Sequence, residues 1–131
     1  MVNISGPISA QQLLGEYQQF ATEYRSFQPT IREITMMSKL DGKSILVLFG
    51  LWCHDSQREI PRLLKLIDQS GVTLSSLRLV AVDGNKQDPS GISEQYHLRF
   101  TPTIILLQDG RELGRVVEKP VHSLSEDLTS I

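Results

Sequence analysis

Cysteine is scarce in this chain of 131 residues, because Cys53 is the only one. A single cysteine cannot close an internal disulfide, and it cannot supply a cysteine-rich zinc site. The three histidines are scattered, so no metal-ligand spacing appears. The sequence therefore predicts no disulfide scaffold and no bound metal, and a reducing compartment is the simplest setting for it.

Long apolar runs and an excess of charge of one sign are also lacking. No run approaches the roughly 20 apolar residues of a membrane-spanning helix, and residues 1–7 do not have the pattern of a secretory signal. The formal net charge is only −2, so no overall basic field attracts nucleic acid or anionic lipid. We expect a cytoplasmic protein with neither nucleic-acid nor membrane partners.

What is present is the composition of a globular domain. Hydrophobic residues make up 40% and charged residues 21% of the chain, close to the averages for such domains. The length suits one core, and no repeat or linker divides it. We expect a single domain over residues 1–131, with an N-terminal helical extension (1–43), a core (44–118) and a C-terminal helix (119–131).

The N-terminal extension predicts two helices. Ser9 and Gln12 form a capping-box pattern, and an apolar stripe follows at helical spacing. The stripe consists of Leu13, Tyr17, Phe20, Tyr24 and Phe27. This spacing favours one helix over about 10–27 whose stripe is a packing face. A second, shorter helix is expected between Pro29 and Gly42, which ends it.

From residue 44 onward, strand and helix patterns alternate. Unbroken apolar runs at 45–49 and 77–82 are typical of central strands that are buried on both faces. A segment with apolar residues at helical spacing lies between them. Asp109-Gly110 between two further apolar runs is a strong hairpin signal. This order predicts an α/β fold, with a central mixed sheet of about four strands flanked by helices.

Three motifs within the core resemble the thioredoxin superfamily. The first buried strand leads directly into Trp52-Cys53, which is similar to the start of the thioredoxin active site. Pro61 lies eight residues beyond Cys53, where the family has a proline that kinks its active-site helix. Thr101-Pro102 resembles the segment that carries the family's cis-proline. The resemblance implies a thioredoxin-like fold with a Cys-x-x-Ser active-site variant and two extra N-terminal helices.

The chain departs from the family pattern in ways that bear on its chemistry. Ser56 stands where dithiol members carry a resolving cysteine, and His54-Asp55 replaces their Gly-Pro. Val47 stands where thioredoxins carry a buried aspartate that helps to deprotonate the resolving cysteine. Both changes argue against ordinary dithiol reductase activity, because a mixed disulfide on Cys53 cannot be released from within the motif.

Cys53 is the candidate nucleophile, because thiolates attack disulfides. The first turn of the following helix offers unpaired N–H groups and the positive end of the helix dipole to a thiolate. The Ser56 hydroxyl, three residues on, could also donate to the sulfur, so Cys53 and Ser56 are the candidate catalytic residues. A protonated His54 would favour the thiolate and Asp55 would oppose it. The alternative that Cys53 is an inert, buried, small hydrophobic residue stays open.

The resemblance also implies a substrate groove. The backbone of Thr101, before Pro102, would face Cys53 and pair with an extended segment of the substrate. Trp52 would form an apolar side of the groove or, equally, serve as a half-buried packing residue. His54 and Asp55 would lie at its edge. The expected partners are protein or glutathione thiols and disulfides.

Functions from different classes remain open at this point. One is a monothiol redox protein that exchanges disulfides through Cys53, with an external thiol such as glutathione as co-substrate and no other cofactor. Another is a non-catalytic binding or redox-sensing module that uses the groove beside Pro102. In that case the N-terminal aromatic stripe could contact a partner or a second copy in a homodimer. A third is a dithiol enzyme completed by a partner's cysteine or by a Cys53–Cys53 dimer.

Overall fold

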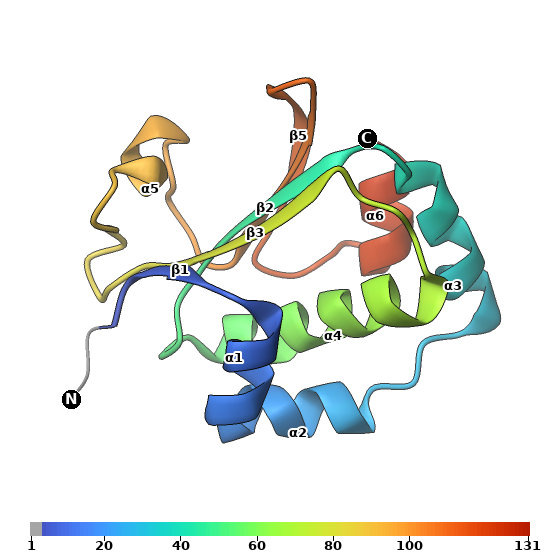
Figure 1. The fold of residues 1–131 in the computed structure, drawn as a ribbon, viewed down its shortest axis with the longest axis horizontal. Coiled ribbons are helices and arrows are strands. Elements are labelled where there is room, and N and C mark those ends of the chain that lie inside the picture. Colours follow the sequence, from blue (N-terminus) through green and yellow to red (C-terminus); the bar gives the residue numbers. More distant parts are fainter. Residues whose placement is uncertain (1–3) are drawn as a thin grey trace.

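Five strands form one mixed sheet in the computed structural model, which describes residues 4–131. They are β1 (Gly6–Ile8), β2 (Ser44–Phe49), β3 (Ser76–Ala81), β4 (Thr103–Gln108) and β5 (Arg111–Val117). Their spatial order is β1-β3-β2-β4-β5. β2 and β3 run parallel, with Val47 beside Leu79, and the other three pairs are antiparallel. The predicted α/β fold with a mixed sheet flanked by helices is therefore confirmed (Figure 1).

The sheet has one short strand that the sequence analysis does not predict. β1 pairs antiparallel with the edge of β3, and Pro7 lies opposite Val80. Three residues are too few to show a period of two, and proline is tolerated in a strand only at an edge or a bulge. The N-terminal extension is therefore not purely helical in the part that the structure describes. Residues 1–3 of that extension lie outside the described residues.

The predicted helix over 10–27 is two helices. α1 (Ala10–Glu16) is capped by Ser9, whose hydroxyl accepts the N–H of Gln12, and α2 (Gln18–Ser26) follows after Tyr17. Tyr17 has an extended backbone, with φ −120° and ψ 102°, and this conformation interrupts the helix. Figure 1 shows α1 and α2 running in different directions as a result.

Four further helices and a short 3₁₀ turn complete the fold within residues 4–131. α3 (Ile31–Met36) begins with a complete capping box between Thr30 and Glu33 and continues into the 3₁₀ turn η1 (Met37–Leu40). α4 (His54–Ser70) contains Pro61 and ends at Gly71, whose left-handed backbone (φ 67°) suits glycine. α5 (Ile92–Gln95) and α6 (Leu124–Thr129) are short.

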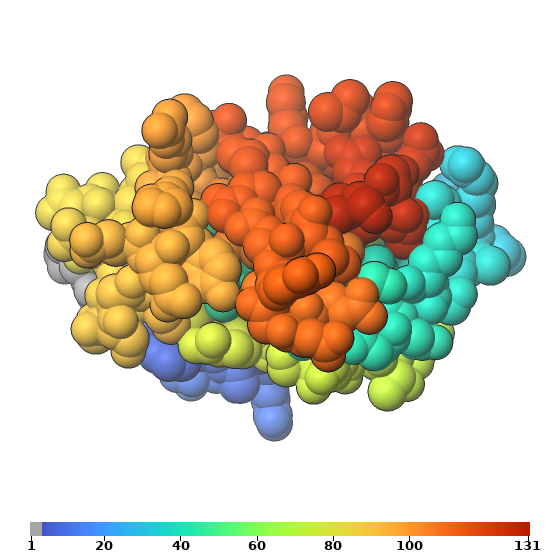
Figure 2. Space-filling view, turned by 90° about the horizontal axis from the view of Figure 1, so that it is seen from above, coloured from blue at the N-terminus to red at the C-terminus, as the bar shows by residue number. Residues whose placement is uncertain are grey.

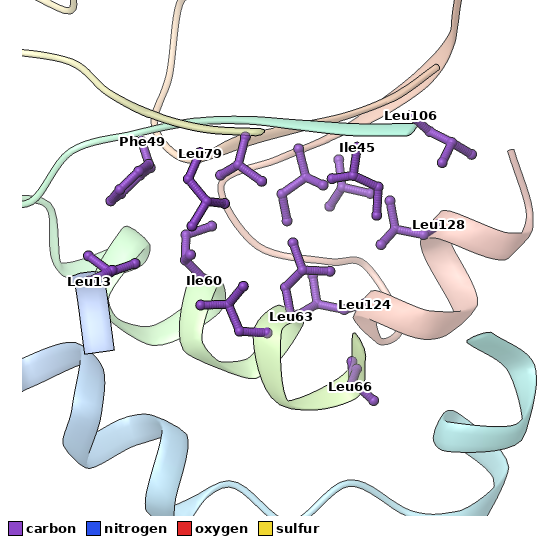
Figure 3. Close-up of a cluster of buried hydrophobic side chains, with 14 of the residues drawn as sticks. Leu13, Ile45, Phe49, Ile60, Leu63, Leu66, Leu79, Leu106, Leu124 and Leu128 are labelled. Atoms are coloured by element: carbon purple, nitrogen blue, oxygen red, sulfur yellow. The ribbon is translucent and has the colours of Figure 1, made fainter. Parts of the chain in front are cut away.

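The main core lies between the sheet and the helices on one of its faces. Side chains from β2, such as Ile45, Val47 and Phe49, point to this face because alternate residues of a strand share a side. Helices α1, α2, α4 and α6 and the turn η1 cover them with buried residues such as Leu63, which is fully buried. Figure 3 shows these leucines and isoleucines packed between the sheet and α4.

The opposite face of the sheet carries a smaller core. Its buried members are Leu46, Leu48, Val80, Ile105 and Leu107. The partly buried side chains of Ile92, Tyr96 and Leu98, from α5 and the segment after it, pack on this cluster. Figure 2 shows the surface of this segment beside that of the β4–β5 hairpin.

The N-terminal aromatic stripe packs inside the chain itself. Leu13 and Phe20 are at most 1% exposed, and Tyr17, Tyr24 and Phe27 are partly buried against the main core. The rings of Phe20 and Phe49 meet edge to face with centroids 5.9 Å apart. Because its own core occupies this face, the stripe does not form the free surface that the suggested homodimer requires.

Polar contacts hold α2 along α4. The Tyr24 hydroxyl donates to the carboxylate of Asp68 at 2.6 Å, and Lys65 donates to the carbonyl of Tyr24 at 2.8 Å. Arg62 pairs with Glu23 at 2.8 Å. The hydrogen bond to Asp68, together with burial and the negative charge, raises the pKa of Tyr24 to about 12.

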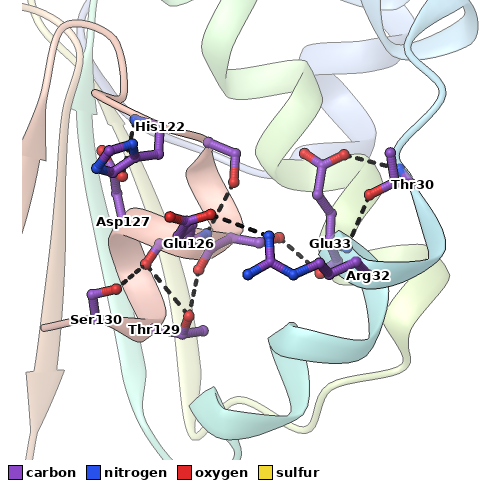
Figure 4. A network of polar contacts seen from close by, with 10 residues as sticks. Thr30, Arg32, Glu33, His122, Glu126, Asp127, Thr129 and Ser130 are labelled. Atoms are coloured by element: carbon purple, nitrogen blue, oxygen red, sulfur yellow. Dashed lines mark hydrogen bonds and ion pairs between the residues drawn. The ribbon is translucent and has the colours of Figure 1, made fainter.

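The C-terminal helix is connected to α3 by a polar network (Figure 4). Arg32 pairs with Glu126 at 3.3 Å, and the Ser125 hydroxyl donates to the carbonyl of Glu33 at 2.8 Å. Asp127 accepts backbone N–H groups from the turn before α6. Residues 119–131 thus fold back onto the same domain.

Among residues 4–131, no helix has both the length and the apolar character needed to cross a membrane.

Candidate functional site

Cys53 lies at the point where the chain turns from β2 into α4. It is the N-cap residue of α4, with φ −90° and ψ 123°. Its N–H donates to the carbonyl of Gly50 at 3.1 Å, and its carbonyl accepts the N–H of Gln57 at 2.9 Å. The side chain is only partly buried. Cys53 is therefore not sealed in the core.

The sulfur faces the backbone before Pro102. The Cys53 thiol donates to the carbonyl oxygen of Thr101 across 3.5 Å, between residues 48 positions apart in the sequence. The Thr101–Pro102 peptide bond is cis, and both residues are buried. The structure therefore brings Cys53, Thr101 and Pro102 together at one place.

The first turn of α4 leaves its N–H groups without a side-chain cap in the described structure. By contrast, hydroxyls of Ser9, Thr30 and Ser123 cap α1, α3 and α6. An N-cap side chain normally accepts from the N–H of the second or third helical residue. The Cys53 sulfur does not accept one of these N–H groups within the described residues, and its thiol donates to the Thr101 carbonyl instead.

The structure does not bring the Ser56 hydroxyl to the sulfur. Ser56 is fully buried, and its Oγ accepts the N–H of Gly50 at 3.1 Å. Within the described residues it makes no hydrogen bond with Cys53. As the third residue of α4, Ser56 faces inward and fixes the turn that follows β2. The interaction expected from the sequence, a hydroxyl that donates to the sulfur, is therefore not observed.

Trp52 is held in place but remains 40% exposed. Its indole Nε1–H donates to the carbonyl of Val82 at 3.2 Å. The ring also lies against Gly50, where an added Cβ would come within 2.6 Å of the indole Cε2. Gly50 is thus needed for this close approach. Trp52 combines the two expected roles, since it packs on the turn and still presents an apolar surface next to Cys53.

A charged network stabilises the start of α4. Arg58 donates through Nη2 to Asp55 at 2.8 Å and through Nε to Glu59 at 2.6 Å. Glu59 is only 3% exposed, and its ion pair with Arg58 supplies the partner that a buried carboxylate requires. The hydrogen bond to Glu59 and then that to Asp55 raise the pKa of Arg58 despite its partial burial. His54 is exposed and forms no part of this network within residues 4–131.

Three residues of the site are not predicted by the sequence analysis. Glu59 carries a charge in a helical stripe that otherwise predicts core packing. Phe100 is 53% exposed directly before Thr101, and its carbonyl accepts the Thr103 hydroxyl at 2.7 Å. Glu118 donates its N–H to the carbonyl of Pro102 at 2.7 Å. An aromatic residue next to Thr101-Pro102 was the one available signal; the contact of Glu118 has none in the sequence.

Two hollows flank the N-terminus of α4. One, of about 470 Å³, lies between α2 and α4, with Thr22 on one side and His54 and Gln57 on the other. The second, of about 720 Å³, lies between α4 and the end of β5. Its lining consists of Asp55, Arg58, Val117, Glu118 and Lys119. No group of three or more histidine, cysteine, aspartate or glutamate side chains in residues 4–131 is placed to hold a metal ion.

This arrangement, a mixed five-stranded sheet with a cysteine at a helix N-terminus opposite an X-Pro segment, defines a thioredoxin fold. Comparison with solved structures agrees. Thioredoxin O1 from Arabidopsis thaliana, in its oxidised state, is similar with a TM-score of 0.52 at 20% identity, over 75% of this chain and 87% of that one. The germline-specific thioredoxin Deadhead from Drosophila melanogaster has a TM-score of 0.50 at 19% identity, over 71% of this chain and 80% of that one.

Sequence comparison adds no closer relationship. No protein-family model matches the chain, and no curated protein matches its sequence. The likeness to thioredoxins is thus one of fold, and the chemistry must be argued from the residues of the site.

Proposed function

We propose that this protein performs monothiol thiol–disulfide exchange through Cys53. The observation that carries this proposal is the placement of the Cys53 sulfur at the N-terminus of α4, 3.5 Å from the Thr101 carbonyl oxygen, in a residue that is only partly buried. The sequence has no second cysteine to resolve the product. The position of the sulfur supports a nucleophilic role for Cys53. The lack of a second cysteine supports a catalytic cycle that needs an external thiol.

The proposed reaction has two balanced steps. The Cys53 thiolate attacks one sulfur of a partner disulfide, the partner's S–S bond breaks, and the other sulfur leaves as a thiolate that takes up a proton. An external thiolate, which we propose to be glutathione, then attacks the partner's sulfur in the mixed disulfide, forms a new S–S bond with it and releases Cys53 as a thiolate. Because an external thiol is required, we place the reaction in a reducing compartment such as the cytoplasm.

The surrounding residues have distinct roles in this proposal. N–H groups in the first turn of α4 stabilise the thiolate, and the Thr101 backbone pairs with an extended segment of the partner beside Pro102. Trp52 supplies an apolar contact for that segment. In this proposal Asp55 and His54 lie at the edge of the groove beside Pro102, and Asp55 is held by its ion pair with Arg58. Ser56 acts as a positioning residue, because its hydroxyl is engaged by Gly50.

The test compares one thiol in two states of the same chain. Native protein and protein unfolded in urea are each treated with oxidised glutathione at pH 7, and the mixed disulfide is quantified by intact mass. We expect the native thiol to react faster and Cys53→Ala to form no adduct. A native rate no higher than that of the unfolded chain would overturn the proposal, because the fold would then contribute nothing to reactivity.

A second candidate function is a redox-sensing or binding module that uses the same groove without turnover. The exposed rings of Trp52 and Phe100 next to Thr101 favour it, because exposed aromatic residues are enriched where proteins bind partners. In this case Cys53→Ser leaves partner binding intact. Mass analysis without reductant after mild oxidation separates both candidates from a Cys53–Cys53 dimer.

A further inference from the structure

Gly50 is bonded to two residues of the candidate site although it has no side chain of its own. Its N–H donates to the Ser56 hydroxyl at 3.1 Å, and its carbonyl accepts the N–H of Cys53, also at 3.1 Å. Gly50 is buried in the turn between β2 and α4. Its backbone is therefore tied both to the residue that carries the sulfur and to the inward-facing hydroxyl of α4.

The same glycine leaves room for the indole of Trp52. A Cβ on Gly50 would lie 2.6 Å from Cε2, 2.8 Å from Cζ2 and 3.0 Å from Nε1 of the ring, whereas carbon atoms in favourable contact are about 3.5–4.0 Å apart. Gly50 is not among the glycines with a left-handed backbone. Space for the indole, and not conformational freedom, is thus the reason for a glycine at this position.

The hydrogen bond of Trp52 depends on this space. Its Nε1–H donates to the carbonyl of Val82, directly after β3, at 3.2 Å. Nε1 is also one of the atoms that a Cβ on Gly50 would crowd. A side chain at residue 50 would force the ring to move by about 1 Å to restore ordinary contact distances. The place of the indole beside Cys53 is therefore set by Gly50.

We infer that Gly50 is a positioning residue that fixes the Trp52 indole relative to the Cys53 sulfur, so that one partner meets both. This inference rests on the proposed exchange through Cys53 and on the apolar contact that the proposal assigns to Trp52. It predicts that a disulfide with an aromatic side chain beside the reacting sulfur reacts faster than one without. It also predicts that this preference is lost when the indole is displaced.

The experiment compares two neutral disulfides that differ in one aromatic ring. They are the symmetrical disulfides of N-acetylphenylalanyl-cysteinamide and of N-acetylglycyl-cysteinamide. Each is mixed with reduced protein at pH 7, and intact mass follows the mixed disulfide on Cys53 as one equivalent of peptide thiol is released. We expect wild-type protein to react faster with the phenylalanyl disulfide. Gly50→Ala lowers the ratio of the two rates by about two- to tenfold, the range for loss of one aromatic contact.

Two comparisons separate the effect on the indole from other effects. Gly114, in β5, is the matched control, because a Cβ there would also crowd a side chain, that of Ile131, at 2.7 Å. Gly114→Ala leaves the rate ratio unchanged. In a chain that already carries Trp52→Ala, Gly50→Ala has no further effect on the ratio. An equal loss with and without the indole overturns the inference, because Gly50 would then act through its backbone bonds.

Tryptophan fluorescence reports on the indole independently of any reaction. Trp52 is the only tryptophan in the chain, so the emission spectrum belongs to this ring. We expect Gly50→Ala to shift the emission maximum, because the ring leaves its contact with the Val82 carbonyl, and Gly114→Ala to leave it in place. An unchanged spectrum overturns the inference, and so does a shifted spectrum without a change in the rate ratio.

The remaining outcomes are also decisive. If Gly50→Ala does not fold, the double variant with Trp52→Ala must fold, since the ring that blocks the Cβ is gone; an unfolded double variant overturns the inference. Equal wild-type rates with both disulfides overturn it while exchange through Cys53 stands. No adduct with either disulfide overturns the proposed function and, with it, the role of Gly50 in partner binding.

Discussion

The two ends of helix α4 are held in different ways. At its C-terminal half, Tyr24 and Lys65 connect it to α2 through bonds of 2.6 and 2.8 Å, and Gly71 ends it in a left-handed conformation. At its N-terminus, no side chain of the described residues caps the helix, and the Cys53 thiol points to Thr101. Both ends are thus held by polar contacts, but the N–H groups of the first turn have no side-chain partner within the described residues.

Other helix starts in the described chain fall into two groups, because α2 and α5 also begin without a side-chain cap, whereas α1, α3 and α6 are capped. α3 and α6 begin with Thr30 and Ser123, whose hydroxyls accept helix N–H groups. These caps stabilise each helix by about 1 kcal/mol. α4 has Cys53 at the equivalent position and therefore lacks the stabilisation that a hydroxyl cap provides. The start of α4 thus differs from those of α3 and α6, and its N–H groups have no side-chain partner within the described residues.

Replacement of the Cys53 thiol by a hydroxyl has the largest expected effect, and it acts at the uncapped start of α4. Cys53→Ser abolishes the mixed disulfide with glutathione, because no thiol remains in the chain. Serine is a good N-cap, so the free energy of unfolding rises by about 0.5–1 kcal/mol. Intact-mass analysis and urea denaturation check the two parts. A stability that falls instead would show that the start of α4 is not available for a cap.

Removal of Arg58, near the N-terminus of α4, has the second-largest expected effect, and this effect is on stability. Arg58→Ala leaves the buried Glu59 without its partner and lowers the free energy of unfolding by about 2–3 kcal/mol. Arg62→Ala is the matched control, because its pair with Glu23 is more exposed, and it costs less than about 1 kcal/mol. Urea denaturation measures both, and equal losses would contradict the importance of Glu59 burial.

Loss of a hydroxyl cap is expected to have a smaller effect, confined to stability. Thr30→Ala removes the bond to the Glu33 N–H and costs about 1 kcal/mol, and Ser123→Ala costs a similar amount at α6. Neither changes the rate at which Cys53 reacts with oxidised glutathione. A change in that rate would mean that the starts of α3 and α6 are coupled to the site.

The Tyr24–Asp68 bond at the anchored end has the smallest expected effect. Tyr24→Phe costs about 0.5–1 kcal/mol, because the bond is partly exposed. The pKa of Tyr24 is raised to about 12 in the folded chain, against about 10 for an unperturbed tyrosine. The folded state therefore keeps this proton longer, and its contribution to stability is present below pH 10 and is lost as the pH rises toward 12.

The measurement is denaturation at a series of alkaline pH values. The free energy of unfolding should fall more steeply between pH 10 and 12 in wild-type protein than in Tyr24→Phe. Parallel curves would show that this hydrogen bond does not persist in solution.

Elements with a strong local pattern could be predicted from the sequence. The runs at 45–49 and 77–82 are strands or their immediate ends, and a short helix forms between Pro29 and Gly42 as expected. β1 could not be predicted, because three residues show no period and its partner β3 lies far along the chain. The break at Tyr17 was also missed, since an unbroken helical spacing continues through it.

The candidate site likewise has residues that could be predicted from the sequence and residues that could not. Cys53 at the start of α4 follows from local spacing, and its meeting with Thr101 was expected only through the resemblance. The direction of the Ser56 hydroxyl and the burial of Glu59 depend on how α4 rests on the sheet. The left-handed backbone of Glu118 accompanies its hydrogen bond with Pro102, and no local sequence pattern predicts it.

The sequence by itself determined the order of elements, the single thiol and its place before an amphipathic helix, because these depend on residues close together in the chain. Tertiary structure alone decided what faces that thiol and which charges surround it. The physical reason is that hydrogen bonds such as those of Cys53 with Thr101 and Glu118 with Pro102 form between segments that only packing brings together.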